Sequence, residues 1–172
     1  MQTIGTLINN GNITCLGSAD NLAITTFTNN AGSLWTYIKI SGTVNVRGGT
    51  YHDLTFDDNA GAAVYTLASG TTTATGTLTV TGGTVAIGTS TLNVTESLAN
   101  SDTITIAGAG VLDVDGNITV GTLTCLGSST INIAGNWSGV TNFTANSSTV
   151  TFNGGGISYI TSGGTSDPYD FS

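Results

Sequence analysis

The chain has 172 residues, of which only 7% are charged and 38% are hydrophobic, and its formal net charge is −8. Two basic side chains cannot neutralise a run of phosphates, so we expect no nucleic-acid partner and no binding to an anionic membrane surface. No apolar run approaches the roughly 18 residues that a membrane span needs, so we expect no membrane insertion.

The composition favours an all-β fold outside the cell. The chain contains 34 threonines and 25 glycines, but one proline, one methionine and one glutamate. β-Branched residues favour strands, and strong helix formers are scarce. A surface solubilised by hydroxyls and amides suits an extracellular or cell-surface location. The first residues show no signal-peptide pattern, so we interpret the chain as a mature or excised segment.

Short strand-like runs follow one another along the chain. In the N-terminal part they cover residues 35–40, 44–46, 54–56 and 64–67. The later runs alternate apolar with small or polar residues, which is the period of a half-buried strand. These later runs cover residues 78–80, 85–87, 92–94, 104–106, 111–114, 118–120 and 131–133.

The spacing of the later runs predicts a parallel β-solenoid, also called a β-helix. Three strands return in order about every 26 residues, as expected for a three-sided coil whose strands stack about 4.8 Å above those of the previous coil. We therefore predict coils of about 26 residues, with irregular coils or another β element in residues 1–75. The predicted core ladders join Leu78 to Ile104 and Ile131, Val85 to Val111, and Leu92 to Ile118.

A longer repeat divides the chain into two parts. The segment Thr14–Ser18 returns as Thr124–Ser128, and Gly48–Thr50 has a counterpart in Gly163–Thr165. We interpret residues 1–56 as a diverged half copy of this repeat and residues 57–172 as a full repeat with regular coils. Together they form one continuous β domain.

Three segments carry a resemblance to known proteins. The strings GTYHDLTFDDNAGAAVYTL, GTLTVTGGTVAIGTSTLNV and INIAGNWSGVTNFTANSSTVTFNGGGISYITSGGT resemble the tandem repeats of large bacterial surface proteins. Over roughly residues 47–172, the chain is similar to adhesin-like and filamentous-haemagglutinin-like β-solenoid repeats. This resemblance implies a solenoid architecture at the cell surface and brings no catalytic residues with it.

Residue types that perform catalysis are scarce, so we expect no enzyme and no cofactor. The single histidine, His52, precedes Asp53, but nothing marks the nucleophile or oxyanion hole of a Ser-His-Asp triad. Parallel β-helix polysaccharide lyases, which resemble the expected architecture, typically combine an acidic cluster with a basic catalytic residue. Only Lys39 and Arg47 could supply that base.

Two acidic segments are candidates for Ca²⁺ binding, and both also fit ordinary turns. They contain Asp57 with Asp58, and Asp113 with Asp115. The second segment fails the EF-hand pattern, because Val111 stands where the first ligand would be. We favour turns and predict no metal site.

Cysteines and asparagines leave further alternatives open. Cys15 and Cys125 occupy matching places in the longer repeat and should lie several coils apart, whereas a disulfide needs Cα atoms within about 7 Å. We favour separate buried thiols, with a bond between neighbouring chains as the alternative.

Six Asn-x-Ser/Thr sequons are candidate glycosylation sites in a competent secretory host: Asn12, Asn93, Asn117, Asn136, Asn142 and Asn146.

The sequence predicts a structural subunit or segment of an extracellular fibre or adhesive surface filament. Its copies would associate head to tail through uncapped β-edges, since the terminal segments look like the interior of a solenoid. The alternative is a ligand-binding solenoid, either an adhesin for surface glycans or an ice-binding protein with threonine ladders. Thr-x-Thr recurs at residues 77–79, 103–105, 122–124 and 149–151, although threonine is also a good outward-facing strand residue.

Overall fold

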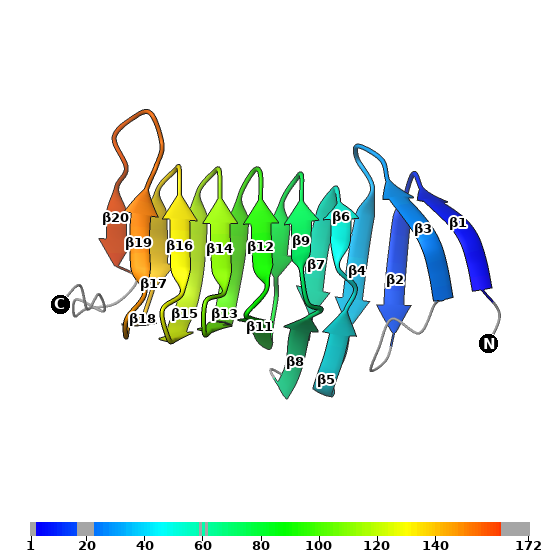
Figure 1. Ribbon diagram of the computed structural model, residues 1–172, viewed down its shortest axis with the longest axis horizontal. Helices are drawn as coiled ribbons and strands as arrows, with labels where there is room; N and C mark the ends of the chain where they lie inside the picture. Colours follow the sequence, from blue (N-terminus) through cyan, green and yellow to red (C-terminus); the bar gives the residue numbers. More distant parts are fainter. Residues whose placement is uncertain (1–2, 17–22, 59, 61, 163–172) are drawn as a thin grey trace.

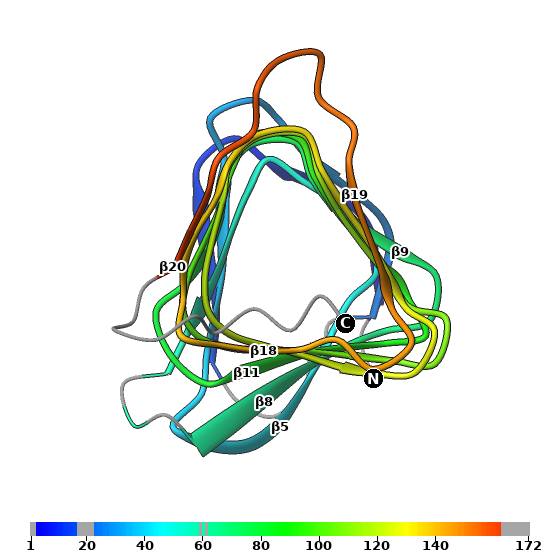
Figure 2. The same cartoon turned by 90° about the vertical axis from the view of Figure 1, so that its left-hand side faces the viewer.

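The computed structural model describes residues 3–16, 23–58, 60 and 62–162. In this part of the chain every regular element is a β-strand. The strands wind into a solenoid of about eight coils with a triangular cross-section (Figures 1 and 2). The predicted all-β parallel solenoid is therefore confirmed.

Each coil has three sides, which we number in the order of the stacked sheets. Side 1 contains β2 (Asn12–Leu16), β4 (Leu34–Ile38), β7 (Asp53–Asp57), β10 (Leu78–Val80), the first parts of β13 (Leu98–Ala107) and β15 (Ile118–Leu126), β17 (Trp137–Val140) and β20 (Ile160–Ser162). Side 2 contains β5 (Ser41–Val46), β8 (Ala62–Leu67), β11 (Thr84–Gly88), the second parts of β13 and β15, and β18 (Asn142–Thr144).

Side 3 forms the remaining face of the triangle. It contains β1 (Thr3–Asn9), β3 (Ala23–Asn29), β6 (Gly49–Tyr51), β9 (Thr71–Ala74), β12 (Thr91–Val94), β14 (Val111–Val114), β16 (Thr130–Ile133) and β19 (Thr149–Phe152). The strands β1 and β3 pair with each other, and β3 lies against β6. The turns from side 3 to side 1 form the upper edge of Figures 1 and 2, and we call them the upper corner.

The coils are shorter than the sequence spacing predicted. Leu98 pairs with Leu78, and the next partner along the stack is Ile118, so successive coils are offset by roughly 20 residues. The predicted interval, such as that from Leu78 to Ile104, combines one whole coil with one side of the triangle. All three sides have the same alternation of apolar and polar residues. A strand on the next side of the next coil therefore resembles the starting strand, and the distance between the two looks like the length of one coil.

The predicted core ladders are wrong for the same reason. Leu78, Ile104 and Ile131 are all buried, but they lie on sides 1, 2 and 3, respectively. Val111 is half-buried and points outward, while its neighbour Leu112 is in the core. The observed inward ladders are Leu54–Leu78–Leu98–Ile118–Trp137 on side 1, Tyr65–Val85–Ile104–Leu123–Phe143 on side 2 and Leu92–Leu112–Ile131–Val150 on side 3.

The N-terminal strands, as far as the structure describes them, belong to the same solenoid rather than to a different β element. Strand β4 pairs with β2 on one edge and with β7 on the other. The coils here are less uniform, and β5 and β8 project outside the triangle of the later coils (Figure 2). The counterpart Gly163–Thr165 of the longer repeat lies outside the described residues, and the division at residue 56 stays a prediction.

Aromatic side chains fill the interior of the N-terminal coils. Phe56 stacks on Tyr65 with ring centroids 4.9 Å apart, and Trp35 packs edge-on against Tyr51 at 5.7 Å. The buried phenols retain polar partners: Tyr65 donates to the carbonyl of Asp57 at 2.6 Å. Large rings can therefore occupy the interior without leaving these hydroxyls unpaired.

Glycine at the upper corner allows neighbouring coils to approach closely. A Cβ atom on Gly116 would overlap the carbonyl oxygen of Glu96, and one on Gly135 would lie 2.5 Å from the carbonyl oxygen of Gly116. The amide of Gly135 donates to the carbonyl of Gly116 at 3.0 Å. Backbone hydrogen bonds thus continue from coil to coil through the turns as well as along the sides.

Matched substitutions in β13 test the corrected register. Ile104 is fully buried between Val85 and Leu123, whereas Thr105 points outward. We expect Ile104→Asp to lower the free energy of unfolding by more than about 4 kcal/mol, because it buries an unpaired charge. Thr105→Asp should cost less than about 1 kcal/mol. Chemical denaturation measures both, and equal costs would contradict the register.

Candidate functional site

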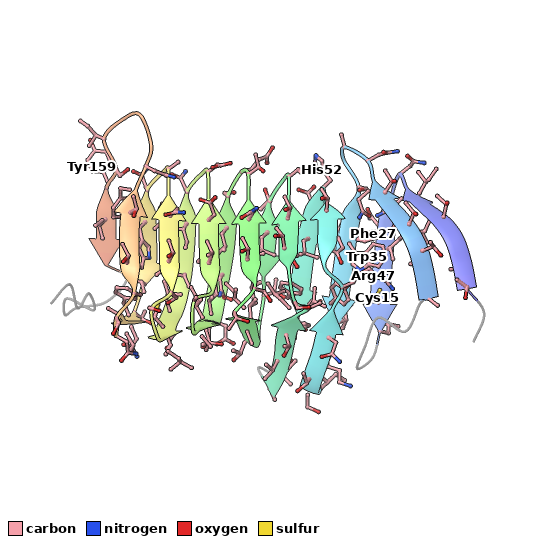
Figure 3. The ribbon with its side chains drawn as sticks, viewed as in Figure 1. Cys15, Phe27, Trp35, Arg47, His52 and Tyr159 are labelled. Atoms are coloured by element: carbon pink, nitrogen blue, oxygen red, sulfur yellow. The ribbon has the colours of Figure 1, made fainter. Side chains whose placement is uncertain are left out.

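His52 and Asp53 lie at the upper corner between β6 and β7, where they connect neighbouring coils (Figure 3). His52 Nδ1 lies 3.2 Å from Asp53 Oδ2. Asp53 Oδ1 accepts a hydrogen bond of 2.8 Å from the amide of Thr77 in the next coil, and a Cβ atom on Gly76 would overlap this oxygen. In the described structure no serine hydroxyl is hydrogen-bonded to His52, and the Asp53 carboxylate joins this turn to the next coil.

The two basic residues are not brought together with His52. Arg47 precedes β6 and His52 follows it, so they lie at opposite ends of that strand. The Arg47 guanidinium lies 5.8 Å from the centre of the Phe27 ring and donates to the carbonyl of Ile24 at 3.4 Å. A cation over an aromatic face is a stabilising contact, and here it joins Arg47 to β3.

Asp57 and Asp58 are held by separate contacts. Asp58 is buried, and its carboxylate accepts hydrogen bonds from the amides of Ala60 and Ala63. Asp57 accepts a hydrogen bond of 2.8 Å from the hydroxyl of Thr81 in the next coil. Amide and hydroxyl donors occupy these oxygens, which favours the turn interpretation of this segment.

Asp113 and Asp115 also lie in different surroundings. Asp113 is in an outward row of side 3, between Asn93 and Asn132. Asp115 is exposed at the upper corner. Over the described ranges, no group of three or more histidine, cysteine, aspartate or glutamate side chains is placed to hold a metal ion.

The cysteines lie far apart along the stack and on different sides. Cys15 is half-buried on side 1 in β2, and Cys125 is buried on side 2 in β15. Neither forms a disulfide. The longer repeat predicted equivalent positions for the two cysteines. The described part of the five-residue segment that they share instead lies on side 1 in one copy and on side 2 in the other, because strands on both sides alternate inward and outward residues in the same way.

The sequon asparagines have two kinds of surroundings. Asn12, Asn117, Asn142 and Asn146 are exposed, and Asn93 and Asn136 are half-buried. The side-chain oxygen of Asn117 accepts the amide of Asn136 at 2.9 Å, and the side-chain nitrogen of Asn146, which glycosylation would modify, donates to the carbonyl of Cys125. Several of these amides therefore connect coils, and glycosylation stays a prediction.

Outward-facing threonines form rows along the stack. On side 1, Thr14, Thr36, Thr55 and Thr79 follow one another in register, and Ala99 then interrupts the row. On side 2, two parallel rows contain Thr84, Thr103 and Thr122, and Ala86, Thr105, Thr124 and Thr144. The sequence-based Thr-x-Thr pairs at 103–105 and 122–124 are therefore adjacent in space.

Both ends of the described solenoid expose the apolar core. The interior coils bury their inward side chains almost completely. The half-buried apolar residues that pack on the core belong to the first and last coils: Ile4, Leu7, Ile13, Cys15, Phe27, Ala145, Val150 and Phe152. Ile160 continues the inward ladder of Trp137, yet it is 43% exposed. Within the described residues, no strand pairs with the outer edges of β1, β2, β19 or β20.

The described residues of the same end coils carry no charged side chain. The charged side chains of the described residues all lie between Lys39 and Asp115, while residues 3–16 and 116–162 contain none. This distribution is visible in the sequence, but its meaning depends on the fold. Within the described residues, the coils at both ends of the stack carry no charged side chain, and the acidic side chains lie in the coils between them.

A separate apolar hollow lies where side 1 turns into side 2 near the N-terminal end. It has a volume of about 330 Å³ and is lined by Leu16, Ile38, Lys39, Ile40 and Ser41. Leu16 and Ile40 are largely exposed. The segment that follows Leu16, residues 17–22, lies outside the described residues.

The buried phenol of Tyr65 gives the fold a pH dependence. Burial, together with the negative charge of Asp58, raises the pKa of Tyr65 from 10.0 to about 12. Both effects disfavour the phenolate, because it would lie in the interior beside a carboxylate. Between these two pH values the folded chain keeps a proton that the unfolded chain releases.

The free energy of unfolding should therefore fall as the pH rises from 10 towards 12. The expected loss from Tyr65 is about 1.4 kcal/mol for each pH unit in this window. Tyr65→Phe removes this contribution, although it also removes the hydrogen bond to Asp57. Denaturation at several pH values would contradict this assignment if the two proteins lost stability in parallel.

Comparisons of this chain with protein-family models, with curated proteins and with solved structures found no match. Among the described residues there is no helix with the length and hydrophobicity to cross a membrane.

Proposed function

We propose that this protein is a structural subunit or segment of an extracellular fibre, and that its copies join end to end. The observation that carries the proposal is the exposure of core residues at both ends of the described solenoid. Parallel strands need a partner on each edge, and an unpaired edge is a template for another chain. A second copy placed on the stack would supply that partner.

The end strands have chemistry suited to such a joint. The two end strands of side 3 have inward-facing side chains that are apolar and half-buried. These side chains are Val150 and Phe152 of β19 and Ile4 and Leu7 of β1. Both strands lie on side 3, at opposite ends of the stack (Figure 1). A joint between different surfaces of identical copies does not close on itself, so it produces a filament.

The distribution of charge supports the same arrangement. Proteins commonly protect free β-edges with charged side chains or proline, and residues 3–16 and 116–162 contain neither. Within the described residues, the end coils therefore carry no charged side chain that would oppose the approach of another end. We also propose that the chain has no enzymatic role, since His52 and Arg47 have contacts that hold coils and strands together.

Matched lysine substitutions in β19 test the fibre. Val150 continues the inward ladder of Ile131, and Thr151 points outward beside it. We expect Val150→Lys to raise the concentration needed for filament formation at least about tenfold, because the joint would have to bury a charge. Thr151→Lys is the control and should change it less than about threefold. Negative-stain imaging and sedimentation give both values.

Folding of the monomer can be separated from assembly in this experiment. The lysine stem at position 150 can reach solvent through the open end, so the variant should remain folded. Circular dichroism and thermal unfolding check this expectation. If both variants assemble like the intact chain, or if the intact chain stays monomeric at high concentration, the proposal is wrong.

The threonine rows of side 2 favour a second candidate, binding to ice. Thr103 and Thr122 are in register, as are Thr105 and Thr124, and regular strand spacing repeats their hydroxyls and methyl groups at fixed intervals. Ala86 and Val64 interrupt the rows, so we favour the fibre. A glycan adhesin has less support, because Tyr159 is the one largely exposed aromatic residue among those described.

Ice binding predicts a side-specific effect of bulky substitutions. If side 2 binds ice, Thr105→Tyr should abolish thermal hysteresis because the larger ring disrupts the regular surface. Thr73→Tyr, on side 3, should preserve it. Absence of thermal hysteresis in the intact protein would exclude this second candidate without affecting the fibre proposal.

A further inference from the structure

Exposed large apolar side chains are concentrated near the two ends of the stack. They are Ile8, Leu16, Ile40, Leu126, Ile157, Tyr159 and Ile160. In the described chain between residues 41 and 125, no large hydrophobic side chain is comparably exposed. Single exposed apolar residues such as Leu126 are ordinary on protein surfaces. The residues that give the two ends of the stack an apolar surface are Ile8 at one end and Ile157, Tyr159 and Ile160 at the other.

Ile8 at the N-terminal end and Ile157 with Tyr159 at the C-terminal end lie at the same corner of the triangle. Ile8 is the penultimate residue of β1, immediately before the turn into β2, and is 61% exposed. Ile157 and Tyr159 belong to the connection from β19 to β20, which projects beyond the other turns of the upper corner (Figure 2). The side view places Tyr159 at the upper corner of the C-terminal end of the stack (Figure 3).

The backbone around Tyr159 is fixed although its ring is exposed. Its amide donates to the side-chain oxygen of Asn136 at 2.9 Å, and its carbonyl accepts the amide of Trp137 at 2.9 Å. Tyr159 is 64% exposed, and Ile157 is 82% exposed. An anchored backbone that presents apolar side chains reduces the entropy lost when a partner binds.

The turn at the opposite end is fixed in a comparable way. Asn9 is buried and donates to the side-chain oxygen of Asn29 at 3.0 Å, and its own side-chain oxygen accepts the amide of Gly11 at 3.0 Å. The side chain of Asn30 donates to that of Asn10 at 2.6 Å. These contacts hold Ile8 on the outer surface next to the upper corner.

We propose that a second copy of this chain is held at the joint by Ile157 and Tyr159, which pack against Ile8 of that copy. The inference rests on the proposed end-to-end fibre and specifies which corner meets which. Stacking the two ends in register places side 3 on side 3 and the upper corner on the upper corner. The projecting β19–β20 connection then overlaps the first turn of the next copy and buries the exposed apolar side chains of both.

This contact also fixes the rotation of one copy on the next. The three sides have similar strand patterns, so backbone pairing alone would accept any of three rotations about the axis. Only one rotation brings the projecting connection over Ile8. The apolar overlap therefore distinguishes the correct joint from two alternatives, which is a requirement for a straight, uniform fibre.

Charge substitutions across the joint test this assignment in the intact chain. We expect Ile8→Lys and Ile157→Glu, made separately, each to raise the concentration needed for assembly at least about tenfold. The double variant I8K/I157E should recover most of that loss, because opposite charges would meet in every joint. Sedimentation and negative-stain imaging provide the measurement.

Leu126→Glu supplies the matched control. Leu126 is 60% exposed and lies at the end of β15, where side 2 ends, so its substitution should leave assembly within about threefold of the intact chain. Recovery in the double variant also shows that the single variants were folded.

The outcomes separate the corner contact from the fibre itself. If the intact chain forms filaments but Ile8→Lys or Ile157→Glu assembles equally well, the corner contact is wrong and the fibre stands. Failure of I8K/I157E to recover, with both single variants folded, also overturns the contact. If the intact chain forms no filaments, the proposed function fails and the corner contact fails with it.

Discussion

Backbone hydrogen bonding between parallel strands of successive coils is the interaction on which the rest of the structure depends. Strands in the middle of the stack have partners on both edges, as β10 has in β7 and β13. This stacking places each inward side chain above an inward side chain and each outward threonine above an outward residue. The apolar ladders, the threonine rows and the glycine-rich corner all follow from that alignment.

The same interaction makes the ends chemically different from the middle. A coil in the middle has its edges paired and its core covered, whereas β1 and β19 present unpaired edges and half-buried apolar residues. The charged residues of the described chain all lie between Lys39 and Asp115. The described end surfaces therefore combine an unpaired backbone edge, an apolar cross-section and a lack of charged side chains, and these features support the proposed end-to-end association.

Residues that suggested chemistry in the sequence have contacts that connect strands and turns. Asp53 accepts the amide of Thr77 from the next coil, Asp58 accepts amides of its own turn, and Arg47 covers Phe27. Such polar contacts connect strands where the side chains cannot form an apolar ladder. The low number of charged groups is consistent with their use at these few corners, where burial requires a partner for each.

The sequence by itself determined the all-β parallel solenoid, because short alternating runs return in order at a regular spacing, as the strands of stacked coils do. It also determined that Ile104 and Leu78 face the core, since alternation defines the buried face of each strand. Only the tertiary structure decided which strand lies above which. The sides share one pattern, so the interval from Leu78 to Ile104 could not be divided, from the sequence alone, into one whole coil and one further side. For the same reason, Ile8 and Tyr159 could be related to one corner only after the coils were stacked.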